Sequence, residues 1–137
     1  MKHLKAWELI RLNEKLLSQY GGLKITRSSN QDARVEALCC RIRSLFEYND
    51  DHTLAGTAAL YCEVIARGHA FSDANKRTAV NALYLFLHRN SQSTRVPAGL
   101  SDVIVKVATG EMTRNQLTDF VQREIIDSNS SITATGH

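Results

Sequence analysis

The chain has 137 residues, of which 43% are hydrophobic and 23% charged, with a formal net charge of +3. This is the size and composition of one globular domain with its own core. No apolar run is long enough to cross a membrane, and the charged N-terminus lacks the apolar stretch of a secretion signal, so we expect a cytoplasmic protein without membrane contact. The three cysteines form no disulfide framework. The basic residues form no cluster, which argues against a nucleic-acid partner.

The first part of the chain predicts two amphipathic helices. Apolar residues recur at helical spacing over residues 4–20, and the pair Gly21-Gly22 ends this helix. Asn30 is placed to cap a second helix, whose apolar positions repeat every three or four residues. These positions are Val35, Leu38, Cys39, Ile42, Leu45 and Phe46.

The middle of the chain predicts two more helices joined by a short polar loop. The third helix covers about residues 53–67 and ends at Gly68, because glycine readily adopts the left-handed conformation of a helix C-terminus. The fourth covers about residues 75–89 and is apolar on almost every side. A helix of that kind belongs in the interior, so we expect residues 75–89 to form the central buried helix.

The last third of the chain predicts two shorter helices. One covers about residues 100–107 and is closed by Gly110. The other begins at Thr113, which with Gln116 has the spacing of a capping box.

No segment shows the sustained alternation of a strand, so the sequence predicts an all-α fold. We expect a single domain of about six helices over residues 1–127. The Ser/Thr-rich residues 128–137 are predicted to be a disordered tail.

The loop between the third and fourth helices, residues 69–77 with the sequence HAFSDANKR, carries the groups suited to chemistry. A helix N-terminus attracts phosphate through its unpaired N–H groups and its dipole, and Lys76 and Arg77 add two positive charges there. Asp73 beside this anion site is explained by a Mg²⁺ ion shared with substrate phosphates. His69 can accept a proton near neutral pH.

Each of these residues has a common structural explanation when taken singly. An Asp before a helix is often a cap, and Lys-Arg in a first turn is often only solvated. Phe71 is expected to be a structural anchor that pins the loop to the core. The joint spacing of base, metal-holding carboxylate and phosphate site nevertheless indicates transfer from a nucleoside triphosphate to a hydroxyl group.

Residues 69–77 resemble the motif of the Fic/Doc family, His-x-Phe-x-(Asp/Glu)-(Gly/Ala)-Asn-(Gly/Lys)-Arg. The variant with Ala74 and Lys76 is similar to the Doc branch, the death-on-curing toxins of bacterial toxin–antitoxin pairs. The resemblance covers about residues 1–126. Further similar segments are residues 20–23, 66–69, 78–79 and 108–111.

The resemblance implies a role for each motif residue. His69 would be the general base on the target hydroxyl, and Asp73 would hold Mg²⁺. Asn75, Lys76 and Arg77 would bind the phosphates of ATP.

Two departures from the family pattern bear on the reaction. Adenylyltransferases of the family typically have Gly where Lys76 stands and a second Arg where Val80 stands. In the Doc branch these departures accompany transfer of the γ-phosphate, with elongation factor Tu as the target and arrest of translation as the outcome. The resemblance therefore implies a protein kinase that acts as a toxin.

Two other functions stay open from the sequence. One is transfer of AMP with the same His69 and Mg²⁺; the other is a non-enzymatic all-helical binding module whose motif is a remnant. The chain lacks the Ser/Thr-x-x-x-Glu signature by which some family members restrain themselves. We therefore expect inhibition by a separate antitoxin, through a segment that folds as a helix on this surface.

Overall fold

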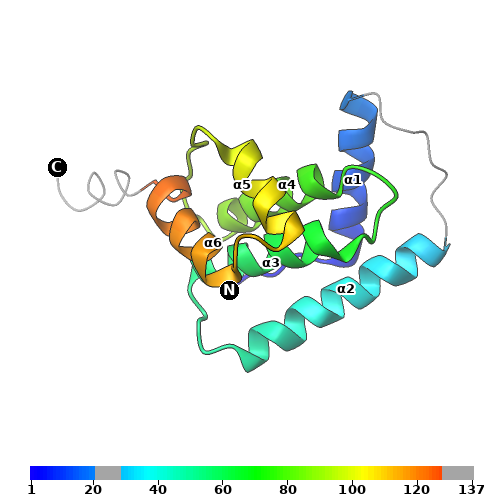
Figure 1. Cartoon of the computed structure of the whole chain (residues 1–137). Coiled ribbons are helices and arrows are strands. Elements are labelled where there is room, and N and C mark those ends of the chain that lie inside the picture. Colours follow the sequence, from blue (N-terminus) through cyan, green and yellow to red (C-terminus); the bar gives the residue numbers. More distant parts are fainter. Residues whose placement is uncertain (21–28, 128–137) are drawn as a thin grey trace.

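The computed structural model describes residues 1–20 and 29–127, and this part of the chain forms six α-helices and one π-helical turn (Figure 1). It contains no strand, only an isolated bridge between Thr94 and Ile126. The all-α prediction of about six helices is confirmed. In chain order the elements are α1 (Ala6–Tyr20), α2 (Ser29–Tyr48), α3 (Leu54–Gly68), α4 (Asn75–Arg89), α5 (Leu100–Thr109), α6 (Arg114–Phe120) and η1 (Val121–Ile125).

Two sequence-based expectations fall partly or wholly beyond these ranges. The predicted tail, residues 128–137, lies outside the described residues, and so do the two glycines expected to end the first helix.

Among the described helices, none combines the length and apolar character that a membrane-spanning segment needs.

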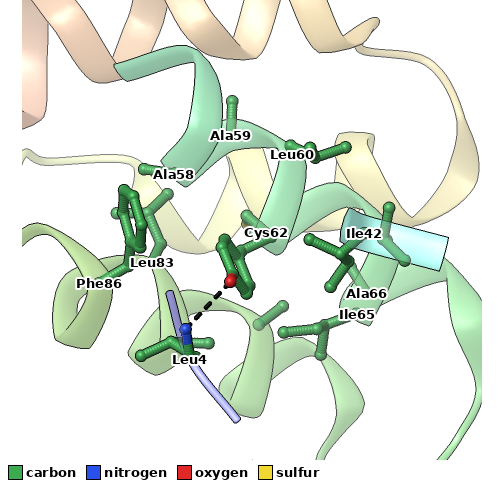
Figure 2. Packing of buried hydrophobic residues seen from close by; sticks show 14 of the residues in the cluster. Leu4, Ile42, Ala58, Ala59, Leu60, Cys62, Ile65, Ala66, Leu83 and Phe86 are labelled. Atoms are coloured by element: carbon green, nitrogen blue, oxygen red, sulfur yellow. Dashed lines mark hydrogen bonds between the residues drawn. The ribbon is translucent and has the colours of Figure 1, made fainter. Parts of the chain in front are cut away.

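Helices α3 and α4 form the middle of the fold. All residues from 55 to 66 in α3 are buried, whereas α4 keeps an outer side on which Asn81 is exposed. Helix α4 packs centrally against α3, as predicted for residues 75–89, but it exposes one side, so α3 is the more deeply buried of the two. Figure 2 shows Cys62 of α3 between Ile42 of α2 and Leu83 of α4. The α4 residues that are buried are Thr78, Ala79, Ala82, Leu83, Phe86 and Leu87.

A tyrosine on α3 links the core to the N-terminal segment. The ring of Tyr61 stacks on Phe86 with 5.2 Å between ring centroids. Its hydroxyl accepts a hydrogen bond from the backbone N–H of Leu4 at 3.0 Å, marked by the dashed line in Figure 2. A buried phenol needs such a partner, so this contact fixes the chain entering α1 against the α3–α4 pair.

Several helix ends are set by capping residues, of which the sequence predicted Thr113 with Gln116 and Gly110 but not Thr53. The hydroxyl of Thr53 accepts from the N–H of Gly56, and Thr113 and Gln116 form the predicted capping box. Gly110 closes α5 in the left-handed region with φ +86°. The expectation for Asn30 is wrong, because α2 already includes Ser29 and Asn30 lies within its first turn.

Gly68 lets the end of α3 approach α2 closely. A Cβ atom at this position would lie 2.7 Å from Cδ1 of Leu38, closer than real Cβ contacts allow. Gly68 is the last residue of α3, but the left-handed conformation expected for it is adopted by the next residue, His69. The missing side chain of Gly68 instead permits the close packing of α2 on α3 that precedes the motif loop.

Candidate active site

A cavity of about 390 Å³ lies where the end of α3, the loop at residues 69–74 and the start of α4 meet. Five of the six residues that the sequence singles out line it, and the sixth, Phe71, is buried in the core with 3% of its surface exposed. The small side chains of Ala66 from α3 and Ala108 from α5 complete the lining. The motif residues in the lining are His69, Ser72, Asp73, Ala74, Asn75, Lys76 and Arg77.

Two residues in left-handed backbone conformations shape the loop. His69 ends α3 with φ 49°, and Ala74 precedes α4 with φ 62°. Residues other than glycine adopt this region at a cost of about 1 kcal/mol, so contacts elsewhere in the loop have to compensate. The two conformations reverse the chain direction between the helices and place His69 beside the first turn of α4.

The side chain of Asn75 holds the loop by bonding to one residue twice. Its Nδ2 donates to the carbonyl oxygen of Phe71 at 2.9 Å, and its Oδ1 accepts from the N–H of Phe71 at 3.2 Å. Both polar atoms of the amide are thus engaged within the loop. A phosphate contact from Asn75 would then come mainly from its backbone N–H at the start of α4.

Two residues outside the motif also hold the loop, and sequence reasoning missed both. Asn13 of α1 is 2% exposed, and its Nδ2 donates to the carbonyl oxygen of Asp73 at 3.0 Å and to Oγ1 of Thr78 at 3.1 Å. Arg34 of α2 donates from Nε to the carbonyl oxygen of Ala70 at 3.3 Å. The loop is therefore buttressed from α1 and α2, which lie far from it in sequence.

The sequence does contain a signal for Asn13. This amide stands on the apolar stripe of α1, four residues after Leu9 and three before Leu16, both of which are buried. A buried polar side chain needs hydrogen-bonding partners. The stripe could therefore have predicted that Asn13 bonds to something, although its spacing does not say to what.

Two charged groups at the start of α4, Asp73 and Lys76, are left available to a ligand. The carboxylate of Asp73 accepts one hydrogen bond, from the N–H of Ala74 at 2.7 Å, and it is exposed. Lys76 is also exposed, and within residues 1–20 and 29–127 no ion pair involves either side chain. The first intrahelical bond of α4 runs from Thr78 to Ala74, so the N–H groups of Asn75 and Lys76 precede the hydrogen-bonded ladder.

This arrangement fits a magnesium ion held jointly by protein and substrate. The described residues contain no group of three or more His, Cys, Asp or Glu side chains that could ligate a metal by themselves. A single exposed carboxylate, Asp73, beside an anion-binding helix end is what Mg²⁺ needs when phosphates supply most of the other ligands. The cavity thus brings together an imidazole, a carboxylate that could hold a metal ion and a helix N-terminus that suits phosphate.

A helical fold with this loop and cavity is the architecture of the Fic/Doc family, and the chain belongs to that family. The family model described as Fic/DOC family matches residues 3–87, more than half of the chain. The chain is also similar to the protein named "Protein kinase doc" from Escherichia phage P1. The two are 37% identical over 123 residues, which cover 90% of this chain and 95% of the relative.

Proposed function

We propose that this protein transfers the γ-phosphate of ATP to a serine or threonine hydroxyl of a target protein. The observation that carries the proposal is the convergence of His69, Asp73 and Lys76 on one cavity at the N-terminus of α4. Each meets one requirement of the reaction: a proton acceptor, a metal-holding group and a cation for phosphate. Similarity over 90% of the chain to a protein named as a kinase supports the same reaction.

In the proposed step the target hydroxyl gives its proton to the imidazole of His69 as its oxygen attacks the γ-phosphorus. A new O–P bond forms, the bond from the γ-phosphorus to the bridging oxygen breaks, and ADP leaves with that electron pair. The first turn of α4 and the side chains of Lys76 and Arg77 receive the phosphates. Mg²⁺ bound by Asp73 would neutralise further phosphate charge.

Transfer of AMP is the rival reaction, and the surroundings of position 80 favour the γ-phosphate. The side chain of Val80 lines a small apolar space with Cys62, Leu83 and Val103, and it is absent from the lining of the motif cavity. Position 80 thus supplies no second cation there. Lys76 lines the cavity in the place where adenylyltransferases have glycine. Both features support a phosphate cradle unlike that of the AMP-transferring members.

The resemblance to the Doc branch extends the proposal to the cell. We infer a toxin that phosphorylates elongation factor Tu, arrests translation and is inhibited by a separate antitoxin protein. The exposed Lys76 and Arg77 beside the cavity would favour an acidic inhibitor. The growth test is direct: expression of the chain alone should arrest bacteria, and its operon neighbour should restore growth. Normal growth with abundant folded protein would count against a toxin.

The reaction itself is tested with ATP labelled separately at the α and γ phosphorus. The purified protein is incubated with Mg²⁺ and either elongation factor Tu or a bacterial lysate, with the His69→Ala variant as the blank. We expect label on elongation factor Tu from the γ position only. Label from the α position only would establish adenylyl transfer. Label from the γ position on another protein would support the kinase activity and exclude elongation factor Tu as the target. Absence of label from both positions would favour the binding module.

A further inference from the structure

A second cavity, of about 520 Å³, lies between α2 and α3 next to the motif loop. Its α2 wall includes Arg34, Leu38 and Arg41, and its α3 wall includes Val64 and Arg67. We call it the arginine cleft. It is a separate space from the motif cavity, and the residues proposed to bind nucleotide do not line it.

The arginine cleft keeps a positive charge that the protein does not neutralise. Arg34, Arg41 and Arg67 are exposed, and within the described part of the chain none of them forms an ion pair. The acid in the lining, Glu63, is buried and accepts from Nη2 and Nε of Arg114 at 2.7 and 2.9 Å. Because Arg114 already compensates Glu63, that carboxylate does not cancel the three arginines.

The cations are spread along the cleft over an apolar floor. Arg34 and Arg41 are seven residues apart on α2, which corresponds to about 10 Å along a helix axis. Between them the surface is formed by Ala37 and Leu38 of α2 and Val64 of α3. A site for one phosphate would draw its cations together, whereas cations two turns apart with apolar side chains between them suit a polypeptide that carries acids at that spacing.

The cleft also leads to the motif loop. Gly68 lines the end of its α3 wall, and the next residue, His69, lines the motif cavity. Arg34 reaches from the cleft to the loop through its bond to the carbonyl oxygen of Ala70. A chain segment lying in the cleft would therefore end beside the group that we propose as the base.

We propose that the arginine cleft docks an acidic segment of the target protein and thereby delivers its hydroxyl to His69. This inference rests on the proposed transfer to a protein hydroxyl, and it adds a recognition rule: acidic side chains about two helical turns apart, close to the hydroxyl. Recognition by exposed arginines predicts an association that weakens as salt rises.

The first test is kinetic and uses Arg41→Glu, because Arg41 is exposed and contacts neither the loop nor Arg114. Arg43→Glu is the matched control: it makes the same charge change two positions further along α2, at an exposed residue that does not line the cleft. With labelled ATP and elongation factor Tu, we expect Arg41→Glu to raise KM for the protein substrate roughly tenfold and to leave KM for ATP unchanged. Arg43→Glu should leave both values near those of the parent.

The second test needs no ATP, so it can fail independently of the proposed function. A fluorescent helical peptide, in which Glu residues are paired seven positions apart, is titrated with the wild-type chain and with both variants. A second peptide, in which Gln replaces these Glu residues, is titrated in the same way. We expect the acidic peptide alone to bind, with affinity reduced by salt and by Arg41→Glu but not by Arg43→Glu.

The outcomes separate the two proposals. Equal KM values in all three proteins, or equal losses in both variants, would overturn the cleft as a docking site while leaving the kinase intact. If Arg41→Glu abolished inhibition by the antitoxin and left KM for the target unchanged, the cleft would be the inhibitor's site and the target assignment would be wrong. If the wild type bound the peptide but transferred no phosphate, the proposed kinase activity would be excluded, and so would the assignment of the cleft to a kinase target.

Discussion

The two ends of α4 use polar residues in opposite ways. At the C-terminal end, Arg89 pairs with Glu8 of α1, and Asn90 exchanges hydrogen bonds with the backbone of Lys2. At the N-terminal end, Asp73 and Lys76 are exposed and form no ion pair with any described residue. At the C-terminal end Arg89 is neutralised within the protein, whereas at the N-terminal end Asp73 and Lys76 are available to a ligand.

The contrast teaches how one helix can serve two purposes. Helix α1 contacts both ends of α4, with Glu8 at one and Asn13 at the other. Among the described residues, Asn13 donates to the backbone carbonyl of Asp73 and to the hydroxyl of Thr78, so it holds the loop without neutralising Asp73 or Lys76. We therefore expect substitutions of charged or titratable groups at the N-terminal end to change activity and not stability, and those at the C-terminal end to do the reverse.

The largest effect is expected from His69→Asn. Asparagine tolerates the left-handed backbone of this position, so the change removes the proposed base without adding strain. We expect γ-phosphate transfer to fall about 10²- to 10⁴-fold, as is usual when a general base is lost. Initial rates with labelled ATP measure the loss, and urea denaturation should give the parent's unfolding free energy. Transfer at the parent rate would exclude His69 as the base.

Asp73→Asn should give the next largest effect. The amide oxygen can still accept from the N–H of Ala74, so the substitution removes the negative charge and keeps the loop contact. Because a neutral amide is a poor ligand for Mg²⁺, transfer should fall roughly 100-fold and need far more metal. A titration of rate against Mg²⁺ tests this. An unchanged Mg²⁺ dependence would show that Asp73 acts only as a cap.

Much of the fold could be predicted because the signals are local. Gly110 and the capping box of Thr113 and Gln116 mark helix ends with neighbouring residues, and the apolar pattern of residues 75–89 indicates an interior helix. The loop's backbone could not be predicted in this way. His69 and Ala74 adopt left-handed conformations that glycine usually signals, and they are held there by contacts made elsewhere in the fold.

The candidate site also combines features that are set locally with features that depend on contacts between distant segments. The motif places His69, Asp73 and Lys76 within eight residues, so their common cavity follows from the local chain. The buttress from Asn13 joins residues 60 positions apart, and no single-sequence pattern specifies which partner a buried amide finds. The arginine cleft likewise depends on the packing of α2 against α3, and the even spread of basic residues along the chain conceals it.

Asn13→Ala should lower both stability and activity, unlike the charge substitutions at either end of α4, because Asn13 is both buried and bound to the loop. The substitution leaves the carbonyl oxygen of Asp73 and the hydroxyl of Thr78 without this donor, which costs about 1–3 kcal/mol of stability. The substitution should also lower transfer about tenfold, because a loosened loop misplaces the groups that bind the phosphates. Urea denaturation and initial rates at saturating ATP measure the two effects.

A matched control for Asn13 is Asn81→Ala. Asn81 is an exposed amide of α4 whose side chain, within residues 1–20 and 29–127, donates to the carbonyl oxygen of Arg77 in its own helix. Alanine is a better helix former, so stability should hold or rise slightly. Equal losses in the two variants would mean that Asn13 has no special connection to the loop.

The smallest effect is expected at the other end of α4, from Glu8→Gln. The hydrogen bond from Arg89, followed by the backbone N–H of Lys5 and then the charge of Arg89, lowers the pKa of the Glu8 carboxyl below its ordinary value of 4.5. The pair therefore stabilises the fold above that value, and the contribution disappears as the pH falls through the lowered pKa, where Glu8 becomes protonated. At about pH 7 the variant should lose less than roughly 1 kcal/mol of stability, with unchanged transfer. As the pH falls through the lowered pKa of Glu8, the difference from the parent should shrink.

His3 also makes the protein less stable in acid, and it has to be separated from Glu8. Burial, followed by the charge of Arg43, lowers the pKa of His3 below 6.5, so the unfolded chain binds the extra proton first and stability falls as the pH drops below that value. This loss occurs in the parent and in Glu8→Gln alike, so it cancels when their unfolding free energies are subtracted at each pH. A difference that stayed constant from neutral pH to acid would show that the Glu8–Arg89 pair contributes through packing alone. The two ends of α4 would then differ in geometry and not in how they use charge.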